Sequence, residues 1–273
     1  TARFLRDLYR EGFRATTAEE EAADRRRRRA RTGRGIFFLE CLRLAQRLCS
    51  SSPALATSMA KLGQGELVLP AFRRRAQLLA EEAEAVTTHA KLDELTRLLS
   101  SSEDRAVVFS EHLPTIDLIG KRVKETGRPA VIFQGSLNRL DRHRGLTPFA
   151  HEPKTVLIST RAGTEGLNLQ FCHQLVNYEL PWNPMVVEQR IGRVHRFGQR
   201  REVELHNYAA RGTVEAHILR LLHTKIRLFE LVVGELDLIL ERMEDEDGES
   251  FAGLLGDLWL SAESDEAFEQ KVE

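Results

Sequence analysis

The feature that most constrains this chain is a regular alternation of short apolar runs and helical patterns that starts after Ser100. The apolar runs are five or six residues long, contain many β-branched and aromatic side chains, and lie between polar or glycine-containing stretches. They occupy residues 106–110, 130–134, 155–160, 174–178 and 203–208, with helices expected at 113–126, 137–149 and 184–195. Strands that alternate with helices predict a parallel sheet that is buried on both faces. The expected fold class is therefore α/β, a doubly wound parallel sheet with helices on both faces.

Further helical patterns lie on either side of this region. Between Ile36 and Cys49 the apolar residues recur at spacings of three and four, and Ser50 to Pro53 ends the pattern. Helices are also expected at 54–62, 70–86 and 89–99, and one long helix at 213–241. An acidic linker at 241–250 and an apolar patch at 251–260 follow. We expect three parts: a helical segment at 1–88, the α/β domain at 89–212, and a long helix with an acidic tail at 213–273.

Charge is distributed unevenly along the chain, although its formal net value is only −1. Arginines fill positions 25–29, and acidic residues dominate after Glu241. The net charge therefore does not indicate that the chain binds nucleic acid. The arginine run is either a solvated surface segment or an element that contacts phosphates, and the acidic tail is either a solvated linker or a brake that docks on that run.

The three cysteines, Cys41, Cys49 and Cys172, are far apart and form no CxxC pair. This spacing supports neither a disulfide framework nor a zinc site, so a reducing cytoplasm is expected and no metal site is predicted. The sequence has no apolar run of about 18 residues and no apolar signal segment at its start. We therefore expect neither a membrane span nor export.

The segment Glu188 to Gln199, with the sequence EQRIGRVHRFGQ, contains the strongest chemical pattern. If it is helical, Gln189, Arg193 and Arg196 lie at i, i+4 and i+7 and point to the same side. A surface helix paired with acidic neighbours would need carboxylates at the intervening positions, and only Glu188 is near. Arginine suits phosphate because its planar fork donates several hydrogen bonds and stays protonated. The pattern therefore favours phosphate recognition.

A second pattern is the glycine-containing loop from Ser159 to Gln170, with the sequence STRAGTEGLNLQ, directly after an expected strand. Ligands of open α/β sheets gather where strands end, and glycines let backbone amides approach phosphate oxygens. The same loop could be an ordinary turn from a strand to a helix. Its place between the first strands and the arginine-containing helix favours phosphate binding.

Five blocks of this chain, in their order and spacing, resemble motifs IV, V and VI of the Swi/Snf family of superfamily 2 DNA-dependent ATPases. They are Val107 to Ser110, Phe133 to Ser136 with Arg142, Ser159 to Gln170, Tyr178 to Pro184, and Gln189 to Gln199. The resemblance covers roughly residues 36–225 and implies the C-terminal RecA-like lobe of such a motor. Thr164 and Glu165 differ from the Gly-Gly or Gly-Ala that is commoner in eukaryotic members. They are similar to bacterial members, including the remodeler that acts on RNA polymerase.

The resemblance implies roles for two groups of residues. Arg193 and Arg196 would reach ATP bound in another lobe, with Arg196 as the finger on the γ-phosphate, and Gln189 would couple that nucleotide to DNA. An arginine supplied in this way is worth about three to five orders of magnitude in phosphoryl transfer. Three loop residues match positions that face the nucleotide: Glu165, Gly166 and Asn168. Five others match positions that hold the DNA backbone: Ser110, Gly135, Ser136, Thr160 and Arg161.

Two motifs that hold a nucleotide are missing from the sequence. No GxxxxGKS or GxxxxGKT segment is present, and the acidic pairs at Asp93 and Asp265 lie in helical contexts rather than after a hydrophobic strand. The resemblance therefore implies that ATP and Mg²⁺ are held mainly by an N-terminal RecA-like lobe of the same full-length protein. The chain alone is expected to show negligible ATPase activity.

The leading interpretation is half of an ATP-dependent translocase that moves along double-stranded DNA, associated with the bacterial nucleoid in the cytoplasm. Its further partners would be RNA polymerase or repair proteins. Two alternatives stay open: a lobe of a strand-separating helicase, and a non-catalytic module that docks on DNA or RNA polymerase. The presence of both Arg193 and Arg196 argues against the module, because docking needs no arginine finger.

Overall fold

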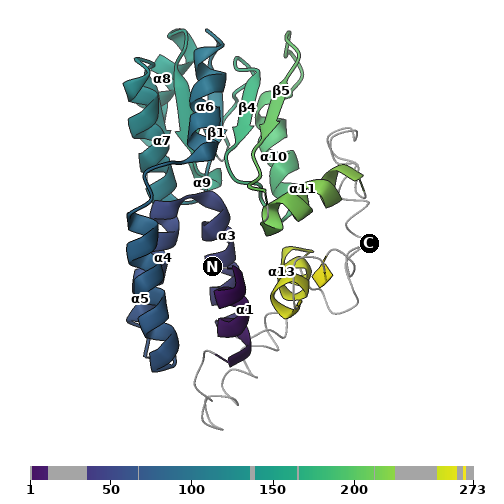
Figure 1. Ribbon diagram of the computed structural model, residues 1–273. Coiled ribbons are helices and arrows are strands. Elements are labelled where there is room, and N and C mark those ends of the chain that lie inside the picture. The colour runs from purple at the N-terminus through teal and green to yellow at the C-terminus, as the bar shows by residue number, and fades with distance from the viewer. Residues whose placement is uncertain are drawn as a thin grey trace. The chain divides into compact units, whose positions relative to one another are not determined.

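The computed structural model describes residues 2–11, 36–66, 68–135, 139–164, 166–211, 213–224, 251–262 and 267–268 (Figure 1). These residues divide into two compact units. The described part of the first unit is residues 2–86, 213–217 and the segments after 250, with their gaps, and that of the second is 87–211 and 218–224. The boundaries expected at 88 and 212 remain predictions.

The second unit is the α/β part of the chain. Its strands are β1 (Ala106–Phe109), β2 (Ala130–Phe133), β3 (Val156–Ser159), β4 (Gln174–Asn177) and β5 (Glu204–Asn207). Its helices are α6 (Ala90–Ser100), α7 (Leu113–Glu125), α8 (Arg139–His151), the short α9 (Arg161–Thr164) and α10 (Pro184–Val194). Every predicted strand is present, with its ends within one residue of the expected position.

The five strands form one parallel sheet in the order β2-β3-β1-β4-β5. The register is level: Phe109 lies opposite both Ser159 and Asn177, and Phe133 also lies opposite Ser159. All the carboxyl ends of the strands therefore meet along one edge. The loops that follow these ends carry most of the residues that the sequence marks as functional.

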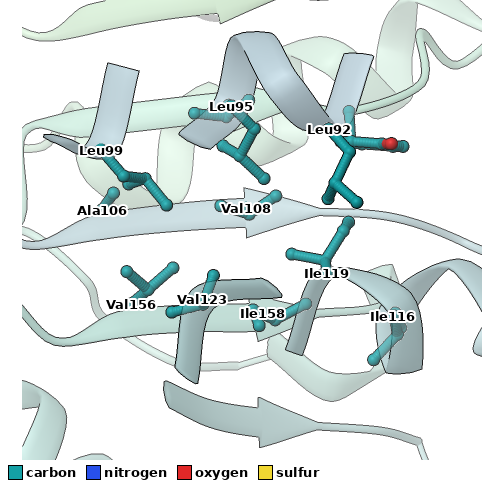
Figure 2. Packing of buried hydrophobic residues seen from close by; sticks show 12 residues of the cluster. Leu92, Leu95, Leu99, Ala106, Val108, Ile116, Ile119, Val123, Val156 and Ile158 are labelled. Carbon is teal, nitrogen blue, oxygen red and sulfur yellow. The ribbon is translucent and has the colours of Figure 1, made fainter. Parts of the chain in front are cut away.

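Alternate residues of the central strands enter two separate cores. Val108 and Ile158 pack with the apolar side chains of α6 and α7 (Figure 2). Val107 and Leu157 belong to the other core, which includes residues of α8 and α10. Because successive side chains of a strand point to opposite faces, helices cover both faces of the sheet. The prediction of a doubly wound α/β fold is confirmed.

The first unit is helical. Its helices are α1 (Ala2–Glu11), α3 (Ile36–Ser50), α4 (Ser52–Gly63), α5 (Pro70–Glu84) and α13 (Phe251–Ser261). Within this unit α1 lies beside α13, because Arg6 donates to the Trp259 carbonyl at 3.3 Å and Arg10 donates to the Ser261 carbonyl at 3.2 Å. These bonds occupy carbonyls at the C-terminal end of α13, which have no partner within the helix.

Helix α11 (Val214–Thr224) is the described part of the long helix expected at 213–241. The rest of that helix, the arginine run at 25–29 and the acidic linker at 241–250 lie outside the described residues. All three cysteines are free and buried. Burial raises the pKa of the Cys41 and Cys172 thiols to about 12, so neither is a nucleophile. Among the described residues no helix is both long and apolar enough to cross a membrane.

Candidate functional site

The candidate site lies where the strands of the α/β unit end. Ser110 follows β1, Gly135 lies two residues after β2, and Thr160 follows β3. The level register brings these three positions to the same edge of the sheet. In doubly wound sheets this edge is the usual place for a ligand.

Arg190 of α10 is the central buried group of this edge. Its side chain is 2% exposed, and its guanidinium donates to Asn177 Oδ1 at 2.7 Å and to Glu111 Oε1 at 2.6 Å. The guanidinium carbon also lies 4.9 Å from the centre of the Phe109 ring. Burial lowers the pKa of Arg190, and the nearby Glu111 carboxylate opposes that shift. A buried cation of this kind is stable only with such partners.

Glu179 joins the end of β1 to the segment that follows β4. Its carboxylate accepts the Ser110 hydroxyl at 2.8 Å and the Glu111 backbone N–H at 2.5 Å. Ser110 is fully buried. In this arrangement the Ser110 hydroxyl is committed to Glu179, contrary to the expectation that it contacts the DNA backbone.

Helix α9 is packed closely against the end of β2. The Thr160 hydroxyl accepts the Gly163 N–H at 3.1 Å, so Thr160 caps this single helical turn and is itself buried. A Cβ on Gly163 would lie 2.5 Å from the Phe133 carbonyl oxygen, so only glycine allows this approach. The expected contact of Thr160 with the DNA backbone would use the hydroxyl proton, because phosphate oxygens accept hydrogen bonds and do not donate them.

Glu111 also holds the start of α9. The Arg161 N–H donates to the two Glu111 carboxylate oxygens at 3.2 and 3.4 Å. Arg161 itself is exposed. A single carboxylate therefore touches the first residue of α9 and the buried guanidinium of α10.

Helix α10 presents part of the predicted arginine pattern. Asn183 caps its start, accepting the Met185 N–H at 2.9 Å, and Pro184 occupies the first turn, as the sequence predicts. The helix ends at Val194, so Gln189 and Arg193 share a helical face but Arg196 does not belong to the helix. The prediction that all three lie on one helix was wrong for Arg196. Its Nε donates instead to the Gly192 carbonyl at 2.8 Å, in the last turn of α10.

A small open hollow lies beside α10. Five residues line it: Arg161, Thr164, Gln189, Arg190 and Arg193. Gln189 is exposed and Arg193 is partly exposed. Within the described residues neither Arg193 nor Arg196 has a carboxylate within ion-pair distance, whereas Arg190 has Glu111. The hollow therefore has an excess of N–H donors and positive charge.

The turn after α10 is fixed from within the domain. Gln199 Nε2 donates to the carbonyls of Gln170 at 2.9 Å and Cys172 at 3.0 Å, and the Gln199 N–H closes a turn on the Arg196 carbonyl. Gly198 has a φ of +98°, which favours glycine. Phe197 is fully exposed at the tip of this turn.

The predicted nucleotide-facing loop is a turn connected to α10. Gly166 has a φ of +78°, and Asn168 Oδ1 accepts the Gln170 N–H at 3.2 Å. The Leu169 N–H donates to the Arg193 carbonyl at 3.0 Å, which ties the loop to the end of the helix. Glu165 and Ser136 lie outside the described residues.

Sequence reasoning missed the internal partners of this site, namely Arg190, Glu111, Asn177 and Glu179. One pattern could have found Arg190. Val187, Arg190 and Val194 follow one another at spacings of three and four, so Arg190 occupies the buried stripe of the helix. A charged residue in that stripe requires a partner.

Comparisons with known proteins relate part of this chain to helicases. Residues 90–198 match the family model described as helicase conserved C-terminal domain. The chain is 44% identical over 151 residues to an uncharacterized ATP-dependent helicase, YqhH, of Bacillus subtilis (strain 168), covering 55% of this chain and 27% of YqhH. It is 34% identical over 136 residues to the RNA polymerase-associated protein RapA of Sodalis glossinidius, covering 49% of this chain and 14% of RapA. The chain thus spans well under two thirds of these relatives.

Two solved structures have a similar fold. The C-terminal part of the Fun30 ATPase domain has a TM-score of 0.50 at 18% identity, covering 90% of this chain and 89% of that one. The helicase domain of Hef from Pyrococcus furiosus has a TM-score of 0.53 at 20% identity, covering 80% of this chain and 54% of that one. At these identities the likeness concerns the fold, which is that of RecA-like helicase C-terminal lobes.

Proposed function

We propose, from the premise that residues 90–198 form a helicase conserved C-terminal domain, that this chain is the C-terminal RecA-like lobe of an ATP-dependent motor on double-stranded DNA. In the full-length protein an N-terminal RecA-like lobe would hold ATP and Mg²⁺. The present lobe would supply Arg193 and Arg196 to the phosphates. The similarity to a protein named as an ATP-dependent helicase supports the use of ATP.

The observation that carries the proposal is the unpaired charge at the hollow beside α10. Gln189 and Arg193 line this hollow next to Arg161, and among the described residues no carboxylate lies within ion-pair distance of Arg193. A fully buried arginine requires a partner, which Arg190 has in Glu111, whereas the partly exposed Arg193 keeps its donors available to a ligand. An unpaired guanidinium at the ligand edge of an α/β sheet fits an anionic ligand that comes from outside this chain.

The donor types at the hollow suit phosphate oxygens rather than a cation. Guanidinium and amide N–H groups donate hydrogen bonds, whereas Mg²⁺ needs oxygen ligands. Within the described residues no group of three or more potential metal-binding side chains occurs. Mg²⁺ would be held mainly by the other lobe and would supply charge neutralisation for the phosphates.

Arg193 and Arg196 would play distinct parts in this scheme. Arg193 already faces the hollow from α10. Arg196 lies in the turn after α10, where it donates a hydrogen bond to the Gly192 carbonyl. When the lobes close, it would exchange this bond for one to the γ-phosphate. Such an exchange keeps the guanidinium satisfied in both states, so the finger can be withdrawn without leaving a donor unpaired.

The loops at the carboxyl ends of β2 and β3 would hold the nucleic acid. Gly135 and Arg161 are exposed, and Ser136 and Thr160 adjoin them in the chain. Backbone N–H groups and an arginine contact phosphates without reading bases. Binding to duplex DNA should therefore depend little on base sequence and should weaken steeply as salt rises.

The experiment measures ATP hydrolysis by the full-length protein with saturating duplex DNA. Arg193→Ala and Arg196→Ala should each lower kcat by about three orders of magnitude or more, as removal of an arginine finger does. Arg201→Ala, at the other end of the sheet, is the matched control and should retain wild-type kcat. The 273-residue chain alone should show no turnover above background. Turnover by the chain alone that disappears in Arg196→Ala would contradict the proposal.

A second candidate is a docking module for RNA polymerase, which the similarity to proteins named RNA polymerase-associated RapA favours. The same variants separate the two functions. If the chain is a docking module, Arg193→Ala should keep the wild-type affinity for RNA polymerase. The rate of ATP hydrolysis by the full-length protein should then also be unchanged in this variant.

A further inference from the structure

One carboxylate, that of Glu111, connects three loops of the candidate site. It follows β1, it accepts the first N–H of α9 at Arg161, and it accepts the buried guanidinium of Arg190 from α10. Its own backbone N–H is held by Glu179. Residues that are distant in sequence thus meet at a single side chain.

The two ends of the Glu111–Arg190 ion pair differ in exposure. The Arg190 side chain is 2% exposed, whereas that of Glu111 is 39% exposed. Solvent or a ligand on the nucleic-acid face therefore reaches Glu111 far more readily than Arg190, which only borders the hollow beside α10. A perturbation that acts on this pair from the nucleic-acid face enters through the carboxylate.

Glu111 lies at the face that we propose for nucleic acid. Its carboxylate binds the backbone N–H of Arg161, a residue that we propose contacts the DNA backbone. A phosphate that approaches Arg161 meets the negative charge of Glu111 and competes with it for the same donor. Arrival of nucleic acid therefore disfavours the present position of the Glu111 carboxylate.

Arg190 lies at the face that we propose for ATP. It is adjacent to Gln189 and three residues before Arg193 on α10, and all three line the same hollow. A buried guanidinium cannot lose its counter-ion without a large desolvation cost, so Arg190 must follow when Glu111 shifts. Because Arg190 is rigidly part of α10, its movement changes the positions of Gln189 and Arg193.

We propose that the Glu111–Arg190 ion pair transmits occupancy of the nucleic-acid face to Gln189 and Arg193, so that duplex DNA increases the rate of ATP hydrolysis. Both members are positioning residues, because neither is placed to touch the reacting atoms. This inference rests on the proposed function. It adds a specific connection between the two faces, made of side chains of this lobe alone.

The test compares two rates of ATP hydrolysis in the full-length protein, with saturating duplex DNA and without DNA. Glu111→Gln removes the charge and keeps the shape and one acceptor oxygen. It should lower the ratio of the two rates about tenfold, a size typical of coupling between sites. The DNA concentration that gives half of the maximal stimulation should stay the same or fall, because a negative charge near the phosphates is removed. General damage to the lobe would raise that concentration.

Two further variants make the test independent of a folding defect. Arg190→Lys keeps the charge but loses the fork that reaches Asn177 and Glu111 together, so it should lower the same ratio. The double variant should be no worse than the more damaging single variant, because both break one link. Glu94→Gln, which breaks the exposed Glu94–Arg97 pair on α6, is the control and should keep the wild-type ratio.

The outcomes separate this inference from the proposed function. If wild-type protein is not stimulated by DNA, or if Arg193→Ala keeps its activity, the proposed function and this inference are both wrong. If those two results are as expected but Glu111→Gln and Arg190→Lys keep the wild-type ratio, only the link is wrong. Additive effects in the double variant would also contradict the link.

Discussion

An arginine is buried at each end of the sheet's strands: Arg190 where the carboxyl ends meet (the carboxyl edge) and Arg128 where the amino ends meet (the amino edge). The two arginines have different kinds of partner. At the carboxyl edge Arg190 bonds to the side chains of Asn177 and Glu111. At the amino edge Arg128 bonds only to backbone carbonyls: those of Lys154 at 2.7 Å, Leu99 at 2.5 Å, Ser102 at 2.7 Å and Asp104. Arg128 thereby stabilises the segments that precede β1 and β3. Arg190 instead connects two side chains, one from the end of β4 and one from the loop after β1.

The charges around the two arginines differ in the same way. At the amino edge Arg201 forms a bidentate pair with Asp104, at 2.7 and 3.0 Å, and Lys154 pairs with Glu103. At the carboxyl edge, within the described residues, Arg193 and Arg196 have no such partner. The charges at the amino edge are paired within the domain, whereas the cations at the carboxyl edge are those that we propose for an anionic ligand. Under this proposal the two edges separate the structural role from the functional role within one sheet.

The largest expected effect on stability is at Arg190. Arg190→Met keeps the apolar stem but leaves Asn177 Oδ1 and the Glu111 carboxylate without their donor. Because Glu111 is partly solvated, we expect the free energy of unfolding to fall by about 2–3 kcal/mol, below the full cost of breaking a buried pair. Urea unfolding followed by Trp182 fluorescence in a Trp259→Phe background reports on the α/β unit alone. A cost under about 0.5 kcal/mol would contradict the burial of this ion pair.

A second effect concerns the close contact of α9. Gly163→Ala places a Cβ against the Phe133 carbonyl oxygen and the Ser159 hydroxyl, so the turn must shift. We expect a loss of about 1–3 kcal/mol in the same unfolding assay, as for other overpacked sites. Gly127→Ala is an instructive contrast, since its Cβ would meet no atom within 4 Å although its φ is +76°. If Gly163→Ala is tolerated better than Gly127→Ala, the packing of α9 against β2 is wrong.

A smaller effect is expected at Arg128. Arg128→Met removes the donors of four carbonyls, but water can reach most of these groups at the edge, so we expect a loss of about 1–2 kcal/mol. The important comparison is with Arg190→Met in the same assay. A larger loss of unfolding free energy in Arg128→Met than in Arg190→Met would contradict the difference in role between the two edges.

The smallest effect is a dependence on pH at Asp104. The hydrogen bond from Arg201 lowers the pKa of Asp104 below its ordinary value of 3.8. A lowered folded-state pKa adds stability above the unfolded pKa, and this stability is lost as pH falls through the folded pKa. Arg201→Gln should therefore lower the free energy of unfolding only slightly near neutral pH, as the loss of an exposed ion pair does, and should leave it unchanged in acid below the folded pKa of Asp104. A difference from wild type that grows in acid would have the wrong sign.

The fold was predictable from the sequence because each strand is a run of apolar residues with polar boundaries. The runs at 106–110 and 174–178 correspond to β1 and β4, and the helical patterns before residue 200 correspond to helices within two residues at each end. Helix α9 was missed because its four residues, Arg161 to Thr164, are too few to show a period. Arg196 was wrongly placed on the same helix as Arg193, because α10 ends at a backbone change at His195, with a ψ of 93°, and the first glycine after the helix comes only at Gly198.

The candidate site was predictable only in part. Gln189 and Arg193 lie at the hollow because helical spacing fixes which side chains share a face. The inward hydroxyl of Ser110 could not be foreseen, because its partner Glu179 is 69 residues away in sequence and meets it only through the pairing of β1 with β4. Long-range pairs of this kind depend on strand order, which local patterns do not contain.

The level ends of the strands restrict how such a lobe can vary. Each of the five strands has four residues and stops opposite its neighbours, so the five loops beyond them start at a common level. Lengthening one strand by two residues would lift its loop by about 7 Å, beyond the reach of any hydrogen bond to the adjacent loops. Insertions within the helices, or in the loops at the amino ends of the strands, would leave that common level unchanged. Changes in length are therefore compatible with this site in the outer layers of the domain but not in its strands.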